Sequence, residues 1–496
     1  MSNITAASFA PVQLSYAAAA LRGVKPRAPG TPFAYAQLGC VDALALICLA
    51  ASNPEGKFFG VMGSTLDAGK AQQTATSRQA TNVTFLSGTP SQMLAATSLP
   101  PLDYLAYDET AQPLTAPERD ALFALAERQM KPSGLFAYHY RAYANADENL
   151  RFLVAEFAPE MNVAQAQEFL YELQALGPDY FASHPIARTA LERAIAGAVP
   201  DDFFLACDAE GATESGTFTA MSGLLPRGFA FVGEADLGAN YLELATPPSA
   251  HAILEGCRNH LLYEPIKDFA RQRLERSDIW CRLPAERSEN PAELFGGFTY
   301  GIIVPTEQVP THIKTQGAPI DLHQPPFAGL IALMSSMPVG IGDFLNHPNG
   351  QDVTPEDAIG AMQVLVAAGV AQPMRGRYPG QRSADLAKPQ WAAAFNRYLD
   401  DAPITSAQVM LASPVVGSAV SLSARDALVM QALNRVGMEN SAGIVQPELQ
   451  RIARDPTLAA QISEAADPSD EAVDAMIKEV INQSLIRWYG YGLLAA

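Results

Sequence analysis

Cysteine is scarce in this sequence: five are spread over 496 residues, and they form no Cys-x-x-Cys pair. An odd, scattered set argues against the disulfide framework of a secreted protein and against a cysteine zinc site. The N-terminus also lacks the basic region and apolar core of a signal peptide. We therefore expect reduced thiols, no bound metal and a cytoplasmic protein.

Long apolar runs and positive charge are scarce too. Residues 43–51 form the longest uninterrupted apolar run, far short of the ~18 residues that a membrane span requires, so we expect none. The chain has 33 lysines and arginines against 52 acidic residues, a formal net charge of −19. A general nucleic-acid binder needs a basic face, so we expect no nucleic-acid partner. The acidic balance suits solubility, or a basic protein partner or protein substrate.

Several catalytic signatures are missing as well. The sequence has no Walker loop, no His-Glu-x-x-His, no Gly-x-Ser-x-Gly and no cysteine–histidine cluster with zinc spacing. These absences argue against a P-loop nucleotide hydrolase, a zinc peptidase and a serine hydrolase of the nucleophile-elbow type.

What is present begins with a strand–helix–strand pattern. An apolar run ends at Gly39, an apolar helical run spans 44–51, and a second apolar run spans 58–62 after an Asn-Pro-Glu-Gly turn. Three more strands and two more helices are expected downstream: strands 82–86, 102–107 and 135–140, and helices 66–80 and 116–129. This alternation predicts an α/β fold with a doubly wound, Rossmann-like sheet.

Polar side chains follow the expected strands at the edge where such sheets bind ligands, beyond the carboxyl ends of the strands. Four of them are candidates for a polar or catalytic site: Tyr107, Asp108, His139 and Tyr140. Two alternatives stay open, because Tyr140 could equally pack on the sheet and His139 could satisfy a local hydrogen bond.

The loop after the first strand and the end of the second strand resemble a known family. Residues 36–43 read Ala-Gln-Leu-Gly-Cys-Val-Asp-Ala, and residues 59–62 read Phe-Gly-Val-Met. They are similar to the Leu-Glu-Leu-Gly-Cys-Gly-x-Gly and Phe-x-Gly-Val-Asp motifs of class I S-adenosylmethionine (SAM) methyltransferases with a methyltransferase regulatory domain, some of which modify protein lysines. The resemblance implies a SAM site made by Gln37, Gly39, Cys40, Val41, Asp42, Met62, Gly88 and Thr89.

The sequence departs from those motifs where the family binds its cofactor. Gln37 replaces the first acid, Val41 and Ala43 replace two loop glycines, and Met62 replaces the acid that binds the ribose. A β-branched valine resists the positive φ that glycine adopts, and a thioether cannot replace a carboxylate as acceptor of the ribose hydroxyls. Two lost charge-assisted hydrogen bonds would weaken SAM binding by about two to four powers of ten.

Later segments extend the resemblance and suggest four domains. Three segments are similar to the family's regulatory domain: 228–236, 266–273 and 276–280. Three expected helices resemble a winged helix: 327–335, 340–346 and 354–368. Its third helix begins with acidic residues and has no basic one, so we interpret it as a protein-contact module. The expected domains are methyltransferase-like (1–185), regulatory-like (186–305), winged-helix-like (306–400) and C-terminal helical (401–496).

Two hypotheses of function follow. The favoured one is a methyltransferase-like protein with an eroded SAM pocket, catalytically weak or inactive, that acts as a binding or assembly module without a cofactor. The alternative is an active SAM-dependent protein (lysine) N-methyltransferase, because methyl transfer depends mainly on alignment of the reactants and leaves no catalytic triad in sequence. The apolar stripe of the last helix, 469–488, is expected in the core; if exposed, it would be a partner or homo-oligomer surface.

Overall fold

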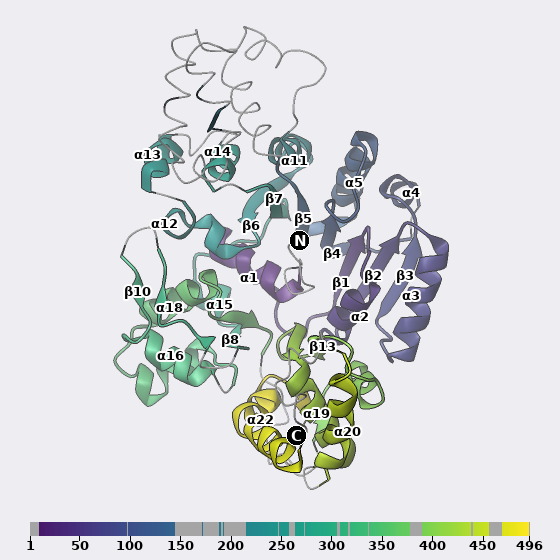
Figure 1. Cartoon of the computed structure of the whole chain (residues 1–496). Helices are drawn as coiled ribbons and strands as arrows, with labels where there is room; N and C mark the ends of the chain where they lie inside the picture. The colour runs from purple at the N-terminus through teal and green to yellow at the C-terminus, as the bar shows by residue number, and fades with distance from the viewer. Residues whose placement is uncertain are drawn as a thin grey trace.

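The computed structural model describes residues 9–96, 98–143, 215–246, 248–256, 263–271, 273–304, 308–315, 318–335, 337–376, 389–437, 440–455 and 469–495, and also 171, 188, 189 and 192. A seven-stranded sheet with the order β3-β2-β1-β4-β5-β7-β6 lies at the centre (Figure 1). Its strands are β1 (Phe33–Leu38), β2 (Gly56–Met62), β3 (Val83–Ser87), β4 (Leu102–Asp108), β5 (Met130–Arg141), β6 (Phe229–Glu234) and β7 (Glu275–Arg282). The first five are parallel, and β7 runs antiparallel to both of its neighbours. The expected α/β, Rossmann-like fold is confirmed.

Helices cover both faces of this sheet because side chains alternate along each strand. Phe33 and Tyr35 of β1 pack on the side of α1 (Pro11–Arg22), α2 (Ala43–Ala51) and α3 (Thr65–Ser77). Ala34 and Ala36 pack on the side of α4 (Pro90–Ala95), α5 (Ala116–Gln129) and α11 (Gly216–Leu224). None of the helices in the described part of the chain combines the length and apolarity needed to cross a membrane.

Strands β6 and β7 lie beyond the boundary expected after residue 185, yet they complete the central sheet. β7 pairs with β5 from Leu135↔Cys281 to Arg141↔Glu275. Two of the segments that resemble the regulatory domain are therefore strands of the same sheet as the SAM motifs. The sequence also predicts helices between 148 and 200, and these lie outside the described residues, except for a few single positions. The division into four domains stays a prediction.

The range 306–400, expected to be winged-helix-like, contains the three helices expected there: α16 (Phe327–Met334), α17 (Ile341–Leu345) and α18 (Pro355–Ala367). Thr354 caps α18 by accepting from Asp357 N at 3.1 Å. After α18, β11 (Gln372–Met374) pairs antiparallel with β8 (Thr299–Gly301). The winged-helix interpretation stays a prediction.

The C-terminal region lies against α2, on the opposite side of the molecule from α11 and α14 (Tyr263–Ala270) (Figure 1). Its elements are β13 (Gln408–Ser413), β14 (Ser418–Ser423), α19 (Ala424–Val436), α20 (Ala442–Ile452) and α22 (Asp470–Gly490). Asn53, after α2, donates from Nδ2 to Gly417 O at 2.9 Å. The apolar stripe of α22 is buried, as expected of a core helix, so it supplies no exposed oligomer surface.

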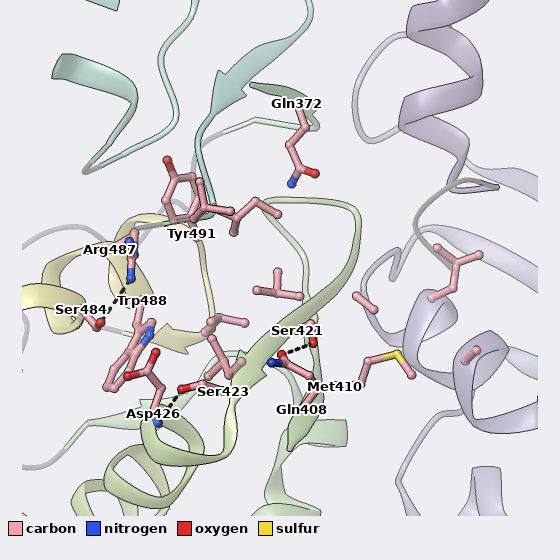
Figure 2. A pocket seen from close by; sticks show the side chains of 18 of the residues that line it. Gln372, Gln408, Met410, Ser421, Ser423, Asp426, Ser484, Arg487, Trp488 and Tyr491 are labelled. Atoms are coloured by element: carbon pink, nitrogen blue, oxygen red, sulfur yellow. Dashed lines mark hydrogen bonds between the residues drawn. The ribbon is translucent and has the colours of Figure 1, made fainter. Parts of the chain in front are cut away.

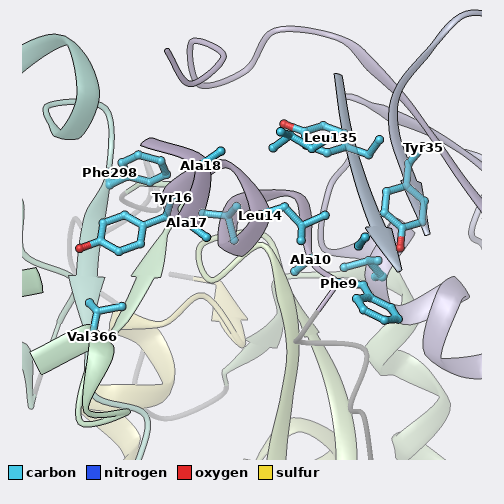
Figure 3. Packing of buried hydrophobic residues seen from close by; sticks show 14 of the residues in the cluster. Phe9, Ala10, Leu14, Tyr16, Ala17, Ala18, Tyr35, Leu135, Phe298 and Val366 are labelled. Carbon is cyan, nitrogen blue, oxygen red and sulfur yellow. The ribbon is translucent and has the colours of Figure 1, made fainter. Parts of the chain in front are cut away.

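Helix α1 connects the sheet with the segment that contains β8. Tyr16 is 1% exposed, and its ring lies edge-on to Phe298 and Tyr300 with centroids 5.3 Å and 5.8 Å away. Phe9, just before α1, lies near Tyr35 of β1 (Figure 3). The N-terminal helix is therefore part of the core that fixes the carboxyl edge of the sheet.

Candidate functional site

The loop between β1 and α2 keeps one conformation expected of a cofactor loop. Gly39 has φ +65°, in the left-handed region that favours glycine. Val41 is not among the described residues with positive φ, and 59% of it is exposed. The backbone at this position therefore does not adopt the left-handed conformation that a valine would resist. Asp42 caps α2, because its Oδ1 accepts from Ala45 N at 2.9 Å. Cys40 is buried, and burial raises the pKa of its thiol to about 12.

A glutamine side chain lies in the crevice above this loop. A Cβ built on Gly39 would lie 3.0 Å from Gln112 Oε1, and one built on Gly63 would lie 3.3 Å from Gln112 Nε2. The Gln112 amide therefore lies between the ends of β1 and β2. The backbone fixes it there, because Tyr107 OH donates to Gln112 O at 2.9 Å and Gln112 N donates to Asp108 O at 3.1 Å. No sequence motif indicated this residue.

The residues at the ends of β2 and β3 make contacts within the fold. Met62 is half-buried, and its side chain packs against the apolar core on the α1 face. Gly88 N donates to Met62 O at 2.9 Å. Thr89 begins α4 in a reciprocal capping box with Gln92, and its hydroxyl also donates to Glu118 Oε1 at 3.1 Å. Thr89 therefore stabilises the start of a helix.

Strand alternation divides the four catalytic candidates between two faces. Asp108 and His139 are paired in register on β4 and β5 and lie on the face of α1 to α3. Tyr107 and Tyr140 belong to the apolar cluster on the opposite face. His139 Nδ1 lies 2.8 Å from Ser277 Oγ, and burial lowers the pKa of this histidine. The structure thus brings only Asp108 and His139 together, and the local hydrogen bond considered for His139 is present.

Tyr140 instead joins a buried cluster of charged side chains on β6, β7 and α14. Its hydroxyl donates to Asp278 Oδ2 at 2.5 Å. The centre of the cluster is Arg276, whose side chain is 0% exposed; it lies 2.9 Å from Asp268, 2.8 Å from Glu264 and 3.0 Å from Asp278. The remaining members are Glu234, Lys267 and Arg271. Ion pairs between the segments that resemble the regulatory domain therefore link β6, β7 and α14 to one another.

The charges in this cluster do not balance. Four acidic side chains (Glu234, Glu264, Asp268 and Asp278) share three cations (Lys267, Arg271 and Arg276). Burial raises the pKa of Asp278 to about 7 and that of Asp268 to about 6, although Arg276 lowers both. Burial also acts on Glu264, but there Arg276 and Lys267 prevail and hold its pKa at about 2. Asp268 and Asp278 therefore release their protons at a higher pH than ordinary aspartates do.

A cavity of about 1050 Å³ opens between the carboxyl edge of the sheet and the C-terminal region (Figure 2). Gln37, Val41, Asp42 and Asp108 line the sheet side. The opposite wall comes from β13, β14, α19 and α22, and includes Gln408, Met410, Ser423, Asp426, Ser484, Arg487 and Trp488. Four of the expected site residues thus form the sheet wall of this cavity. No sequence motif indicated the residues of the opposite wall.

The comparisons with known proteins agree with this architecture. The family model described as "Predicted methyltransferase regulatory domain" matches residues 218–282, which include β6, α14 and β7. The solved structure of PKMT2 from Rickettsia typhi is similar over 99% of both chains, with a TM-score of 0.64 and 14% identity. Its complex with AdoHcy gives a TM-score of 0.62 at the same identity and coverage. No curated protein matches the chain.

The sheet order, the glycine-turned loop after β1 and the regulatory-domain match define a class I SAM methyltransferase fold with a methyltransferase regulatory domain, as the resemblance implied. At 14% identity the likeness to PKMT2 establishes the fold of this chain over nearly its whole length. The activity of the chain has to be argued from its own residues.

Proposed function

We propose that this protein is a methyltransferase-like protein whose SAM crevice is eroded, so that it is catalytically weak or inactive and works as a binding or assembly module. The observation that carries this proposal is the Gln112 amide, which lies between Gly39 and Gly63 where the ends of β1 and β2 meet. A ribosyl donor held by those two strand ends would have to displace it.

The surrounding residues do not fit SAM. Met62 stands where the resembled family has an acid for the ribose hydroxyls, and its thioether is a weak acceptor. Asp42, which could replace that acid, already caps α2. Asp108 Oδ1 accepts from the backbone N of Thr110 and Ala111 at 3.0 Å each, so this carboxylate holds its own turn. We therefore assign no step to SAM in this chain.

The second candidate function is an active SAM-dependent protein (lysine) N-methyltransferase. The likeness to PKMT2 over 99% of both chains favours it, since that protein is known in complex with AdoHcy. A protein partner suits either function, because a net charge of −19 favours a basic protein surface. A cytoplasmic location and the absence of a nucleic-acid partner stay predictions.

Restoring the crevice tests the proposal. Met62→Asp supplies the missing carboxylate, and Gln112→Ala removes the amide between the strand ends. We expect calorimetry to detect no saturable binding of SAM or AdoHcy by the wild type at about 1 mM, and the double variant to bind at least about 100-fold more tightly. Gln73→Ala, at an exposed position of α3, is the matched control and should behave as the wild type. Micromolar binding by the wild type would instead support the active enzyme.

A further inference from the structure

The far wall of the cavity contains a buried arginine without a counter-ion. Arg487 of α22 is 8% exposed, and its one side-chain hydrogen bond to a described residue runs from Nη2 to Ser484 Oγ at 3.2 Å. Over the described part of the chain, no carboxylate oxygen lies within 4.0 Å of its guanidinium. The neighbouring Arg425, by contrast, is paired with Glu479 at 2.6 Å. Burying a guanidinium without a counter-ion costs folding free energy unless a ligand supplies the opposite charge.

A carboxylate lies on the same wall and is likewise unpaired. Asp426, in the first turn of α19, lines the cavity and has no cation within 4.0 Å among the described residues. Burial raises the pKa of Asp426, whereas Arg487, Arg425 and a hydrogen bond with the Ser423 side chain lower it. Asp426 and Arg487 therefore attract each other without lying within 4.0 Å. The N-terminus of α19, a helix of 13 residues capped by Ser423, adds partial positive charge to the same wall.

Apolar and aromatic side chains line the same cavity as the two charges. Trp488 lines it from the end of α22 and Tyr491 from the residue just beyond this helix (Figure 2). Val420 and Leu422 line it from β14. A phosphate or other simple anion would satisfy Arg487 but would be repelled by Asp426. A ligand with both charges on neighbouring atoms and an apolar body complements both charged side chains and the apolar side chains on this wall.

We propose that this end of the cavity binds a zwitterionic small molecule, an α-amino acid with an apolar side chain, whose carboxylate contacts Arg487 and whose ammonium contacts Asp426. The two ionic contacts fix its orientation, and the aromatic wall holds its side chain. The site lies on the C-terminal region and does not depend on whether the SAM crevice works.

The test is calorimetry on the full chain with L-phenylalanine as the probe. Arg487→Gln and Asp426→Asn should each weaken its binding by about tenfold or more, the size of one charge-assisted hydrogen bond. Arg454→Gln, on an exposed segment, is the matched control. 3-Phenylpropionate, which lacks the ammonium, should bind more weakly than L-phenylalanine to the wild type, and the Asp426→Asn change should not weaken it further.

Thermal unfolding keeps the test independent of folding defects. Because Arg487 has no counter-ion, Arg487→Gln should leave the unfolding temperature unchanged or higher in the absence of ligand. The proposal is overturned if L-phenylalanine gives no binding heat at about 10 mM, the concentration that would detect even millimolar affinity. It is also overturned if Arg487→Gln binds the amino acid as the wild type does, or if inorganic phosphate binds and L-phenylalanine does not.

Discussion

Replacing Arg276 with methionine removes the guanidinium at the centre of the buried charge cluster. It lies 2.8–3.0 Å from Glu264, Asp268 and Asp278, and its own side chain is 0% exposed, so water cannot take its place. Removing one partner of a buried ion pair costs about 3–5 kcal/mol. Here Asp268 and Asp278 lose the cation that pairs with both, while Glu264 keeps Lys267 at 2.6 Å. We therefore expect the free energy of unfolding to fall by about 4 kcal/mol or more at pH 7.5.

Urea denaturation followed by circular dichroism measures this loss, with Arg454→Met at an exposed position as the control. The loss should be smaller at pH 5, because carboxyl groups without their cation take up protons more readily and become neutral. A loss below about 1 kcal/mol at pH 7.5, the range of an exposed ion pair, would refute the view that this cluster holds β6 and β7 in the sheet.

Two further predictions concern single groups. The folded-state pKa of Asp278, about 7, lies above its ordinary value of 3.8, so its contribution to stability is full below pH 4 and is lost as the pH rises to 7. The free energy of unfolding of the wild type minus that of Asp278→Asn should therefore decline between pH 4 and pH 7. A difference that does not change with pH would contradict this prediction. Gly39→Ala places a Cβ 3.0 Å from Gln112 Oε1 at φ +65° and should lower stability by about 1–2 kcal/mol in thermal unfolding. Gly69→Ala in α3, where a Cβ would have nothing within 4 Å, should raise stability slightly. Equal effects of the two changes would contradict the view that the loop at residue 39 requires glycine.

Local patterns predicted the first half of the sheet well, because each strand and helix there is specified by its own periodicity. The apolar runs around Gly39 gave β1, α2 and β2, and the stripe of α22 is buried as expected. The place of β6 and β7 could not be read in this way. His139 pairs with Ser277, far along the chain, and a strand's periodicity does not name its partner.

The site was predicted only on one wall. A strand period of two could have shown that Asp108 and Tyr107 lie on opposite faces, as do His139 and Tyr140. That Asp108 and His139 share a face depends on the register between β4 and β5. The position of Gln112 depends on a hydrogen bond from Tyr107 and a turn after β4, which no spacing encodes. For Arg487 a signal was present: a charged residue directly beside Trp488 at the buried end of an apolar helix, where charge is rare unless it is paired or binds a ligand.

In our central claim, the ends of β1 and β2 in this protein no longer hold a ribosyl cofactor. Titration of the wild-type protein with AdoHcy by calorimetry tests that claim most directly. We predict no saturable heat up to about 1 mM ligand, since about two to four powers of ten in affinity are lost with the acid that Met62 replaces. A micromolar dissociation constant would contradict the account and establish the crevice as a working cofactor site.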